Sequence, residues 1–351
     1  MASVIVFFFL PGVNRVAFIH SGSLLIFPFV IIGSIVSLCY GNIYGIGSYP
    51  MFFAIMYFCF TARAIMTKEF FEKMLDTMCM GGCLATLIAL ALDNNLPRAQ
   101  AGFPNPNFLG AALMISVLAC IYKVVSKTPQ TYIYIVYGAI NALGIILCGS
   151  MSIWVIIGIA ATVLFLINKN TNLFIALVCA IVVVTLALVF KPEFFSRLDE
   201  VGVTTQNRIN IWSFALQNIK DAPILGRGFF SYRYLLEMFL PTNPDIQRAS
   251  LAHNILIDSV LCHGIVGTGT LLTYVIYYFK DMAICRKKLK QNKQKRTLNS
   301  FVIAVCVAVA VYGLIDTTFI WVQSGTLLLL ITSGLGADEN KIRTIQKSGL
   351  I

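Results

Sequence analysis

The chain has 351 residues, of which 58% are hydrophobic and only 12% are charged, and its formal net charge is +11. A soluble globular domain carries about 25% charged residues, so this composition excludes a water-soluble domain and favours a protein whose main solvent is the lipid bilayer. The length provides for about ten apolar helices of roughly 20 residues each.

Ten apolar segments are predicted to cross the membrane as helices, because a helix satisfies its backbone hydrogen bonds within the segment. The strands of a membrane β-barrel would show short stretches of alternating hydrophobicity instead. In chain order the predicted spans are 24–40, 49–66, 74–92, 108–126, 131–148, 151–167, 172–190, 254–279, 299–318 and 320–337. We therefore expect an all-α integral membrane protein that forms a single polytopic domain, 1–351.

The first ten residues, Met1 to Leu10, are apolar but too few for an ordinary span. They are an eleventh span that ends at Pro11, a re-entrant piece or a truncated start. A cleaved signal peptide would begin with basic residues, and this segment has none. The expected fold therefore has about 10–11 transmembrane helices, with one long external loop before the last three spans.

Two charge-free runs are too long for one span, and each contains a break near its middle. Gly41-Asn42 to Pro50 divides the run 16–62, and Cys148-Gly149-Ser150 divides the run 128–168. Each of these two runs therefore predicts a pair of helices.

Lys and Arg concentrate in the cytoplasmic loops of membrane proteins. The strongest basic cluster runs from Lys280 to Arg296, and placing it inside fixes every other loop by alternation. That orientation puts 18 of the 26 basic residues inside and leaves seven of the other eight in the long external loop, 191–252. The positive charge is then explained by topology and by contact with anionic lipid, so it implies no nucleic-acid partner.

The first polar external segment runs from Asp93 to Gly110 and reads DNNLPRAQAGFPNPNFLG. Its prolines and glycines predict a shaped loop, and Asn107 is placed to cap the helix that follows. Asn-Pro-Asn considered by itself is more often a plain helix start than a functional motif.

The external loop 191–252 contains a predicted amphipathic helix. The stretch RINIWSFALQNIK, from Arg208 to Lys220, has apolar residues at helical spacing on one face, namely Ile209, Trp212, Leu216 and Ile219. Such a helix is suited to lie on the membrane surface with Trp212 at the level of the headgroups. Pro223, Gly226 and Gly228 are then predicted to end the helix and turn the chain.

Arginine is abundant in the same loop, and this topology turns five of its arginines outward: Arg197, Arg208, Arg227, Arg233 and Arg248. Binding of an apolar helix face to the membrane does not require these arginines. Guanidinium groups match phosphate oxygens with two parallel hydrogen bonds. The cluster therefore suggests an anionic, lipid-linked ligand.

His253 stands at the outer start of the eighth span and is one of only three histidines in the chain. A single histidine at a helix start is usually structural, but histidine ordinarily titrates near neutral pH, which suits a general base beside an arginine-rich loop. Asp258 lies one turn further in, on the same face as Asn254. An ionisable group inside a span is a functional candidate by default. Asp316, near the outer end of the ninth span, is a candidate for the same reason.

Three motifs together resemble the O-antigen ligase/polymerase family of bacterial envelope glycosyltransferases. The family pattern begins with an external Gly-x-x-Asn-Pro-Asn loop, seen here from Gly102 to Asn107. It continues with Arg-x-x-x-Trp and Pro-x-x-Gly-x-Gly, seen as Arg208 to Trp212 and Pro223 to Gly228. It ends with His-Asn and Gly-x-x-Gly, seen as His253-Asn254 and Gly264 to Gly267. Each motif is weak, but their order and spacing over 102–269 are fairly specific.

The resemblance implies a glycan transfer from undecaprenyl pyrophosphate to an acceptor, without a metal, nucleotide sugar or other cofactor. It places the protein in the bacterial cytoplasmic membrane, with its active site facing the periplasm or exterior. Arg208 would bind the donor pyrophosphate and stabilise it as it leaves, and His253 would activate the acceptor hydroxyl. The expected substrate-binding residues are Arg98, Asn107, Arg197, Trp212, Arg227, Asn254 and Asp258. Membrane lipids and a chain-length regulator protein are possible further partners.

One position departs from the family pattern. Ligase-like members often carry a Ser-Arg pair at the outer start of a middle span, and here the matching stretch is Gly149-Ser150-Met151-Ser152. Met151 therefore replaces a second pyrophosphate contact, and Arg98 or Arg197 are the residues able to substitute for it. The departure slightly favours a polymerase over a ligase.

The leading hypothesis is a polymerase of lipid-linked repeat units for O-antigen, capsule or exopolysaccharide. The nearest alternative is a ligase that moves finished glycan to a lipid A core or another acceptor. A lipid or solute transporter is less favoured, because transporters show repeated halves with broken helices at mid-membrane, and the sequence has no such pairing. A non-catalytic scaffold is the remaining alternative, and it would tolerate substitution of Arg208 and His253.

Overall fold

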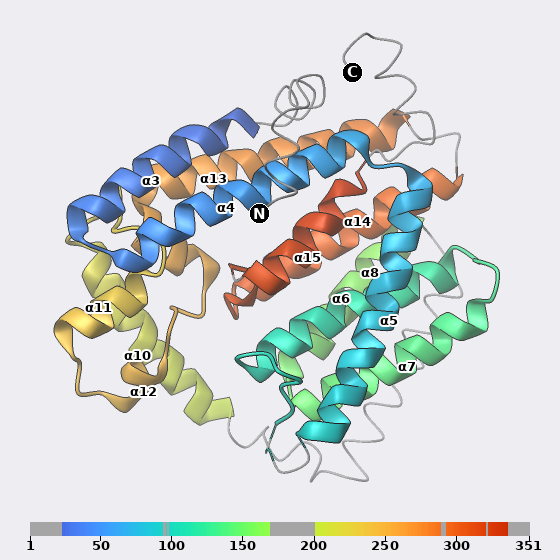
Figure 1. Ribbon diagram of the computed structural model, residues 1–351, viewed down its shortest axis with the longest axis horizontal. Helices are drawn as coiled ribbons and strands as arrows, with labels where there is room; N and C mark the ends of the chain where they lie inside the picture. Colours follow the sequence, from blue (N-terminus) through green and yellow to red (C-terminus); the bar gives the residue numbers. More distant parts are fainter. Residues whose placement is uncertain are drawn as a thin grey trace.

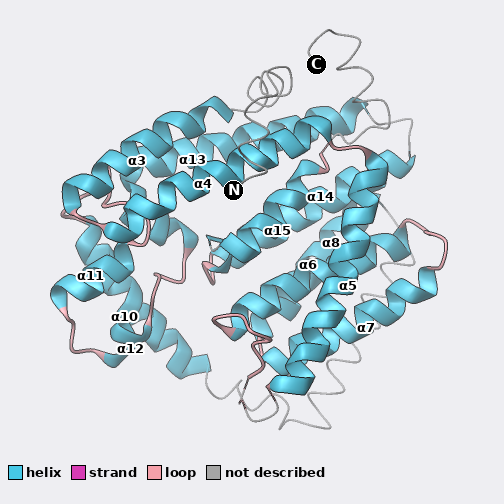
Figure 2. Ribbon diagram, viewed as in Figure 1, coloured by secondary structure: helices cyan, strands magenta, loops and turns pink. Residues whose placement is uncertain are grey.

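The computed structural model describes residues 23–93, 96, 98–168, 201–288, 293–320 and 322–335. Helices and the loops that join them account for all of this described part, and it contains no strand (Figure 2). The α-helices are α3 (Ile26–Tyr40), α4 (Ile43–Ile65), α5 (Lys68–Leu92), α6 (Pro106–Val125), α7 (Thr131–Cys148), α8 (Met151–Asn168), α10 (Val201–Ile219), α11 (Ser231–Phe239), α12 (Pro244–Arg248), α13 (Ile255–Lys288), α14 (Lys293–Gly313) and α15 (Val322–Ser333). Two short 3-10 turns are η1 (Ser23–Leu25) and η3 (Thr318–Ile320).

Nine of the ten predicted spans coincide with described helices. Six of these helices are long and apolar enough to cross a bilayer: α4, α5, α6, α7, α13 and α14. Helices α3, α8 and α15 are apolar but shorter. The protein is therefore an all-α, multi-pass integral membrane protein. The predicted span 172–190 and the apolar start 1–10 lie outside the described residues, so the number of spans stays a prediction.

The membrane helices form two groups, with α15 between them (Figure 1). In one group α3 packs on α4 and α13, and in the other α5, α6, α7, α8 and α14 pack around one another. Helix α6 is the centre of the second group, because 78% of the residues in its most apolar stretch are buried inside the protein. Helices α10, α11 and α12 lie together beyond the ends of α3, α4 and α13 (Figure 1).

The break predicted between 41 and 50 is shorter in the structure than the sequence suggested. Gly41 ends α3 in a left-handed conformation, with φ of 67°, and the side chain of Asn42 caps α4 by accepting from the Gly45 amide. Helix α4 then begins at Ile43 and carries Pro50 within it, so Pro50 does not interrupt the chain. The predicted break at Gly149 is confirmed, because Gly149 ends α7 with φ of 62° and α8 begins two residues later.

Helix α10 buries half of the predicted apolar face together with residues beside it. Ile209 and Leu216 are exposed, whereas Ile211 and Ala215 are buried against α11, α13 and the segment before α13. Trp212 and Ile219, from the predicted face, pack against the same cluster. The helix therefore forms one wall of a small hydrophobic core.

Helix α13 is broken where the sequence predicted one continuous span. Gly264 has φ of 61° and ψ of −171°, which is not helical. The turn after α10 fills the break: the Gly228 amide donates to the Cys262 carbonyl over 2.7 Å, and the Ile265 amide donates to the Pro223 carbonyl over 2.9 Å. A Cβ atom at Gly264 would lie 2.2 Å from the Ile224 carbonyl oxygen, so this close approach requires glycine.

Candidate active site

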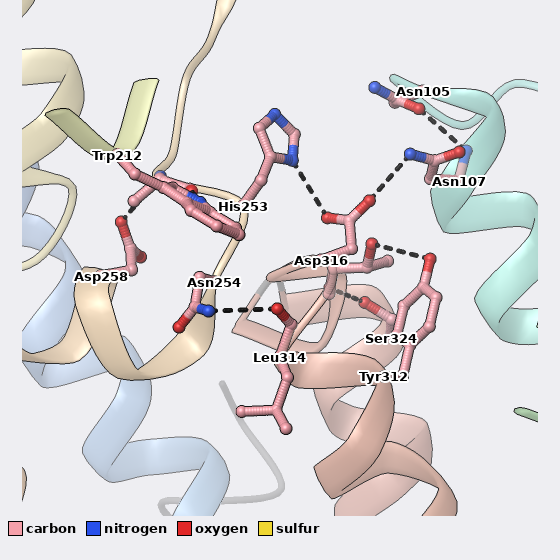
Figure 3. Close-up of polar contacts among 12 residues, drawn as sticks. Asn105, Asn107, Trp212, His253, Asn254, Asp258, Tyr312, Leu314, Asp316 and Ser324 are labelled. Carbon is pink, nitrogen blue, oxygen red and sulfur yellow. Dashed lines mark hydrogen bonds and ion pairs between the residues drawn. The ribbon is translucent and has the colours of Figure 1, made fainter. Parts of the chain in front are cut away.

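His253 and Asp316 meet where the two helix groups face each other. His253 precedes α13, and Asp316 lies in the turn between α14 and η3. The Nδ1 atom of His253 is 3.3 Å from Oδ1 of Asp316 (Figure 3). Asp316 is buried, with 6% of its surface exposed, while the His253 side chain is 29% exposed. The pair therefore combines a buried carboxylate with an accessible imidazole.

The other oxygen of Asp316 is bound from the side of the site opposite His253. Asn107, in the first turn of α6, donates its Nδ2–H to Asp316 Oδ2 over 2.8 Å (Figure 3). Arg98 donates from Nη2 to Asn107 Oδ1 over 2.8 Å and from Nε to the Cys148 carbonyl at the end of α7, also over 2.8 Å. Both Asp316 oxygens are thus engaged, one by each side of the site.

Arg208 supplies positive charge to the same carboxylate. Its half-buried side chain projects from α10, and among the described residues no carboxylate forms an ion pair with it. Burial by itself raises the pKa of the Asp316 carboxyl. The hydrogen bond from His253, the charges of His253 and Arg208, and a hydrogen bond from Thr318 outweigh burial and hold that pKa below its ordinary value. Asp316 is therefore an anion at neutral pH.

The backbone of His253 is held in an uncommon conformation. Its φ is 50°, in the left-handed region that non-glycine residues rarely adopt. The preceding peptide is fixed on both sides, because Ala252 donates its amide to Asp258 over 3.1 Å and accepts from Trp212 Nε1 over 2.9 Å. Residues kept in such conformations by their surroundings cluster at active sites.

Asn254 fixes the other side of His253. Its Oδ1 accepts from the Leu256 amide over 3.0 Å and so caps α13, and its Nδ2 donates to the Leu314 carbonyl over 3.1 Å. Leu314 is two residues before Asp316, so this bond ties the histidine segment to the segment that carries the carboxylate (Figure 3).

The residues predicted for the site thus divide into several sets. His253 and Asn107 contact Asp316, Arg98 contacts Asn107, and the charge of Arg208 acts on Asp316, whereas Trp212, Asn254 and Asp258 hold the backbone on either side of His253. Arg227 lies elsewhere: it is buried and donates to the Asn218 carbonyl over 2.7 Å, and it stacks over Tyr40. Arg197 lies outside the described residues.

The direct contact between His253 and Asp316 is the feature that the sequence did not predict. Asp316 was a candidate only because it is an ionisable residue at the end of a span. Its partner lies 63 positions earlier in the chain, and the spacing of motifs carries no information on that pairing. Among the described residues, no group of three or more His, Cys, Asp or Glu side chains is arranged to hold a metal ion.

A histidine oriented by a carboxylate, with an arginine nearby, is the usual arrangement of a general base beside an anionic substrate group. The fold and site therefore describe an all-α membrane protein with a polar, partly buried site at one end of its helices.

A family model described as O-Antigen ligase matches residues 136–272, a segment that includes Arg208, Trp212 and His253. The match covers the second and third motifs and agrees with the resemblance drawn from them. No match was found among the curated proteins.

Proposed function

We propose that the protein is a membrane glycosyltransferase that polymerises undecaprenyl-pyrophosphate-linked repeat units of O-antigen, capsule or exopolysaccharide. The observation that carries this proposal is the His253–Asp316 pair with the Arg208 charge beside it. It provides a base for the acceptor and a cation for the pyrophosphate. The family match supports the same class of chemistry.

In the proposed reaction, the acceptor hydroxyl attacks the anomeric carbon of the donor glycan. The proton of that hydroxyl passes to Nε2 of His253, and the bond between the anomeric carbon and the pyrophosphate oxygen breaks. The electron pair leaves with undecaprenyl pyrophosphate, whose developing charge is stabilised by Arg208. Asp316 stabilises the imidazolium that forms, so neither a metal nor a nucleotide sugar is needed.

The proposed location is the bacterial cytoplasmic membrane, with this site facing the periplasm or exterior. The lipid-linked donor reaches the site from the bilayer, and membrane lipids surround the protein. A chain-length regulator protein is a further proposed partner. A ligase is the alternative, and the family match supports the shared class of chemistry without separating the two activities. The two activities differ in acceptor and share the chemistry above.

The experiment is a gel of surface and lipid-linked glycans from the source bacterium after deletion of this gene. The deletion strain is complemented with the wild type, His253→Ala, Arg208→Ala or Lys220→Ala. Lys220 follows the end of α10 and is exposed, so it is a matched basic control for Arg208. Immunoblots verify that each variant accumulates in the membrane.

Single repeat units on the acceptor in the deletion strain identify a polymerase, whereas long chains that stay on undecaprenyl pyrophosphate identify a ligase. We expect His253→Ala and Arg208→Ala to fail to restore the glycan, because removal of a general base costs about 10²–10⁴-fold in rate. Lys220→Ala is expected to restore it. Unchanged glycans after deletion, or full rescue by both site variants, contradict the proposal and favour transport or a scaffold.

A further inference from the structure

We propose that Asn107 and Arg98 are positioning residues, which set the orientation and tautomer of His253 through Asp316. This inference rests on the proposed function and replaces the expectation that both residues bind substrate. Its basis is an unbroken chain of side-chain contacts from the Cys148 carbonyl through Arg98, Asn107 and Asp316 to His253.

Arg98 determines which way the amide of Asn107 points. A guanidinium group only donates hydrogen bonds, so the Asn107 atom that faces Arg98 Nη2 is the carbonyl oxygen. The amide NH₂ group must then face Asp316, where Nδ2 lies 2.8 Å from Oδ2. Without Arg98 this amide is able to turn over and to present its oxygen to the carboxylate, which would repel it.

Asp316 in turn determines which nitrogen of His253 carries the proton. An ionised carboxylate only accepts hydrogen bonds, so Nδ1 of His253, 3.3 Å away, is the protonated nitrogen. Nε2 then keeps its lone pair and is the atom able to take a proton from an acceptor hydroxyl. Asn107 holds the far oxygen of Asp316 and so prevents the carboxylate from rotating away.

The start of α6 separates this role from that of an ordinary helix cap. Asn105 is the capping residue, because its Oδ1 accepts from the Asn107 amide over 2.8 Å, and Pro106 occupies the first helical turn. The side chain of Asn107 is therefore not used for capping and reaches Asp316 in the segment after α14 (Figure 3). Two asparagines of one motif thus have different tasks, which provides a matched control.

The test measures glycan transfer by the purified full-length protein in lipid nanodiscs. The donor is the polyprenyl-pyrophosphate-linked glycan extracted from the source cells, and its concentration is varied to obtain kcat and KM. Asn107→Ala and Arg98→Ala are expected to lower kcat by about 10–100-fold, the range found when hydrogen-bonded partners that orient metal-ligating histidines are removed. KM for the donor should stay unchanged. Asn105→Ala should lower thermal stability and leave kcat within about two-fold.

Asn107→Asp gives a readout that a merely structural role would not change. The introduced carboxyl group faces Asp316 and Arg98, with His253, Arg208 and Tyr312 around Asp316. When both carboxyls are ionised they repel, and when they share one proton the introduced group donates to Asp316 as the amide does. The activity of Asn107→Asp relative to the wild type should therefore rise as the pH is lowered.

Three outcomes overturn the inference. One is a raised donor KM with unchanged kcat in Arg98→Ala, which would restore a direct role in donor binding. The second is equal kcat losses in Asn107→Ala and Asn105→Ala, and the third is a ratio of Asn107→Asp to wild-type activity that does not depend on pH. No transfer by the wild type would instead count against the proposed function, whereas any of these three outcomes, in a wild type that transfers glycan and loses transfer in His253→Ala, would count against the inference alone.

Discussion

His253 is held by contacts on both sides of it in the chain. Asp258 and Trp212 bind the peptide before it, and Asn254 binds both the helix start and Leu314 after it. Together they support a backbone with φ of 50°, a conformation that costs free energy in isolation. Asp258 therefore has a role even though it does not contact Asp316, because it fixes the segment that carries the histidine.

The first prediction concerns the stability contributed by Asp316. Its pKa in the folded protein lies below its ordinary value, so ionisation of Asp316 favours the folded state. That contribution is complete above the ordinary pKa of about 3.9 and is lost as the pH falls through the lower folded pKa. The melting temperature of the wild type should exceed that of Asp316→Asn at pH 7, and the difference should shrink below about pH 4.

Differential scanning fluorimetry in detergent across this pH range provides the measurement. Asp221→Asn is the control, because Asp221 is exposed and its ion pair with Arg227 is 3.5 Å long. A difference between the wild type and Asp316→Asn that stays constant from neutral to acidic pH would contradict the linkage.

Residue identity in the site was partly predictable from the sequence. Arg208, His253 and Asn107 were found because each is a polar residue in one of the three motifs predicted to face outward. The roles of Trp212, Asn254 and Asp258 were not predictable, because each acts on the backbone beside His253 and not through a recognisable motif. Arg227 shows the limit of counting arginines, because a guanidinium group that binds a helix end has the same sequence signature as one that binds phosphate.

At the scale of elements, the site depends on the turn that fills the break in α13. The Arg227 and Gly228 amides both donate to the Cys262 carbonyl, which the broken helix leaves without its ordinary partner. The same turn is tied to the α3–α4 connection, because Asn42 Nδ2 donates to the carbonyls of Arg227 and Phe229. The turn thus joins α10, the helix that carries Arg208, to the membrane helices.

The second prediction tests this break. Gly264→Ala places a Cβ atom against backbone in a left-handed conformation, so it should lower the free energy of unfolding by about 2–4 kcal/mol. Gly269→Ala is the matched control in the same helix, because no atom lies within 4 Å of its added Cβ. It should be neutral or stabilising by up to about 1 kcal/mol. Thermal unfolding of both variants gives the comparison, and equal stabilities would contradict the account of the break.

Helix positions were the most predictable part of the fold, because long apolar runs leave few alternatives. The break in α13 was not predicted, since Gly264 and Gly267 occur within a stretch that carries no Asp, Glu, Lys or Arg. Only half of the predicted apolar face of α10, Trp212 and Ile219, packs against the core, because hydrophobic spacing identifies an apolar face fully only when a single face fits.

At the scale of the whole molecule, ion pairs and hydrogen bonds between segments lie at both ends of the helices. At one end are the contacts of Asn42, Arg98, His253 and Asp316 described above. At the other end Arg63 pairs with Asp281 over 3.1 Å, and the buried Lys123 pairs with Glu72 over 2.7 Å. The loops that alternation assigns to one side therefore lie together, which agrees with the predicted topology.

The third prediction concerns the orientation of these ends in the membrane. In a background in which the exposed Cys39 is replaced by Ser, Lys220→Cys should react with a membrane-impermeant maleimide in intact spheroplasts. Lys287→Cys should react only after permeabilisation, because the basic cluster that contains it is predicted to be cytoplasmic. The reverse pattern would place the His253 site on the cytoplasmic side and contradict its proposed contact with exported donors.

The central claim is that the site around His253 transfers glycan from a polyprenyl pyrophosphate donor. Its most direct test measures the release of undecaprenyl pyrophosphate by the purified protein in nanodiscs, together with lengthening of the glycan. The donor is the lipid-linked glycan extracted from the source cells. The account predicts that the wild type releases both products in equal amounts and that His253→Ala and Asp316→Asn release neither at a comparable rate. Release at the wild-type rate by His253→Ala would contradict it.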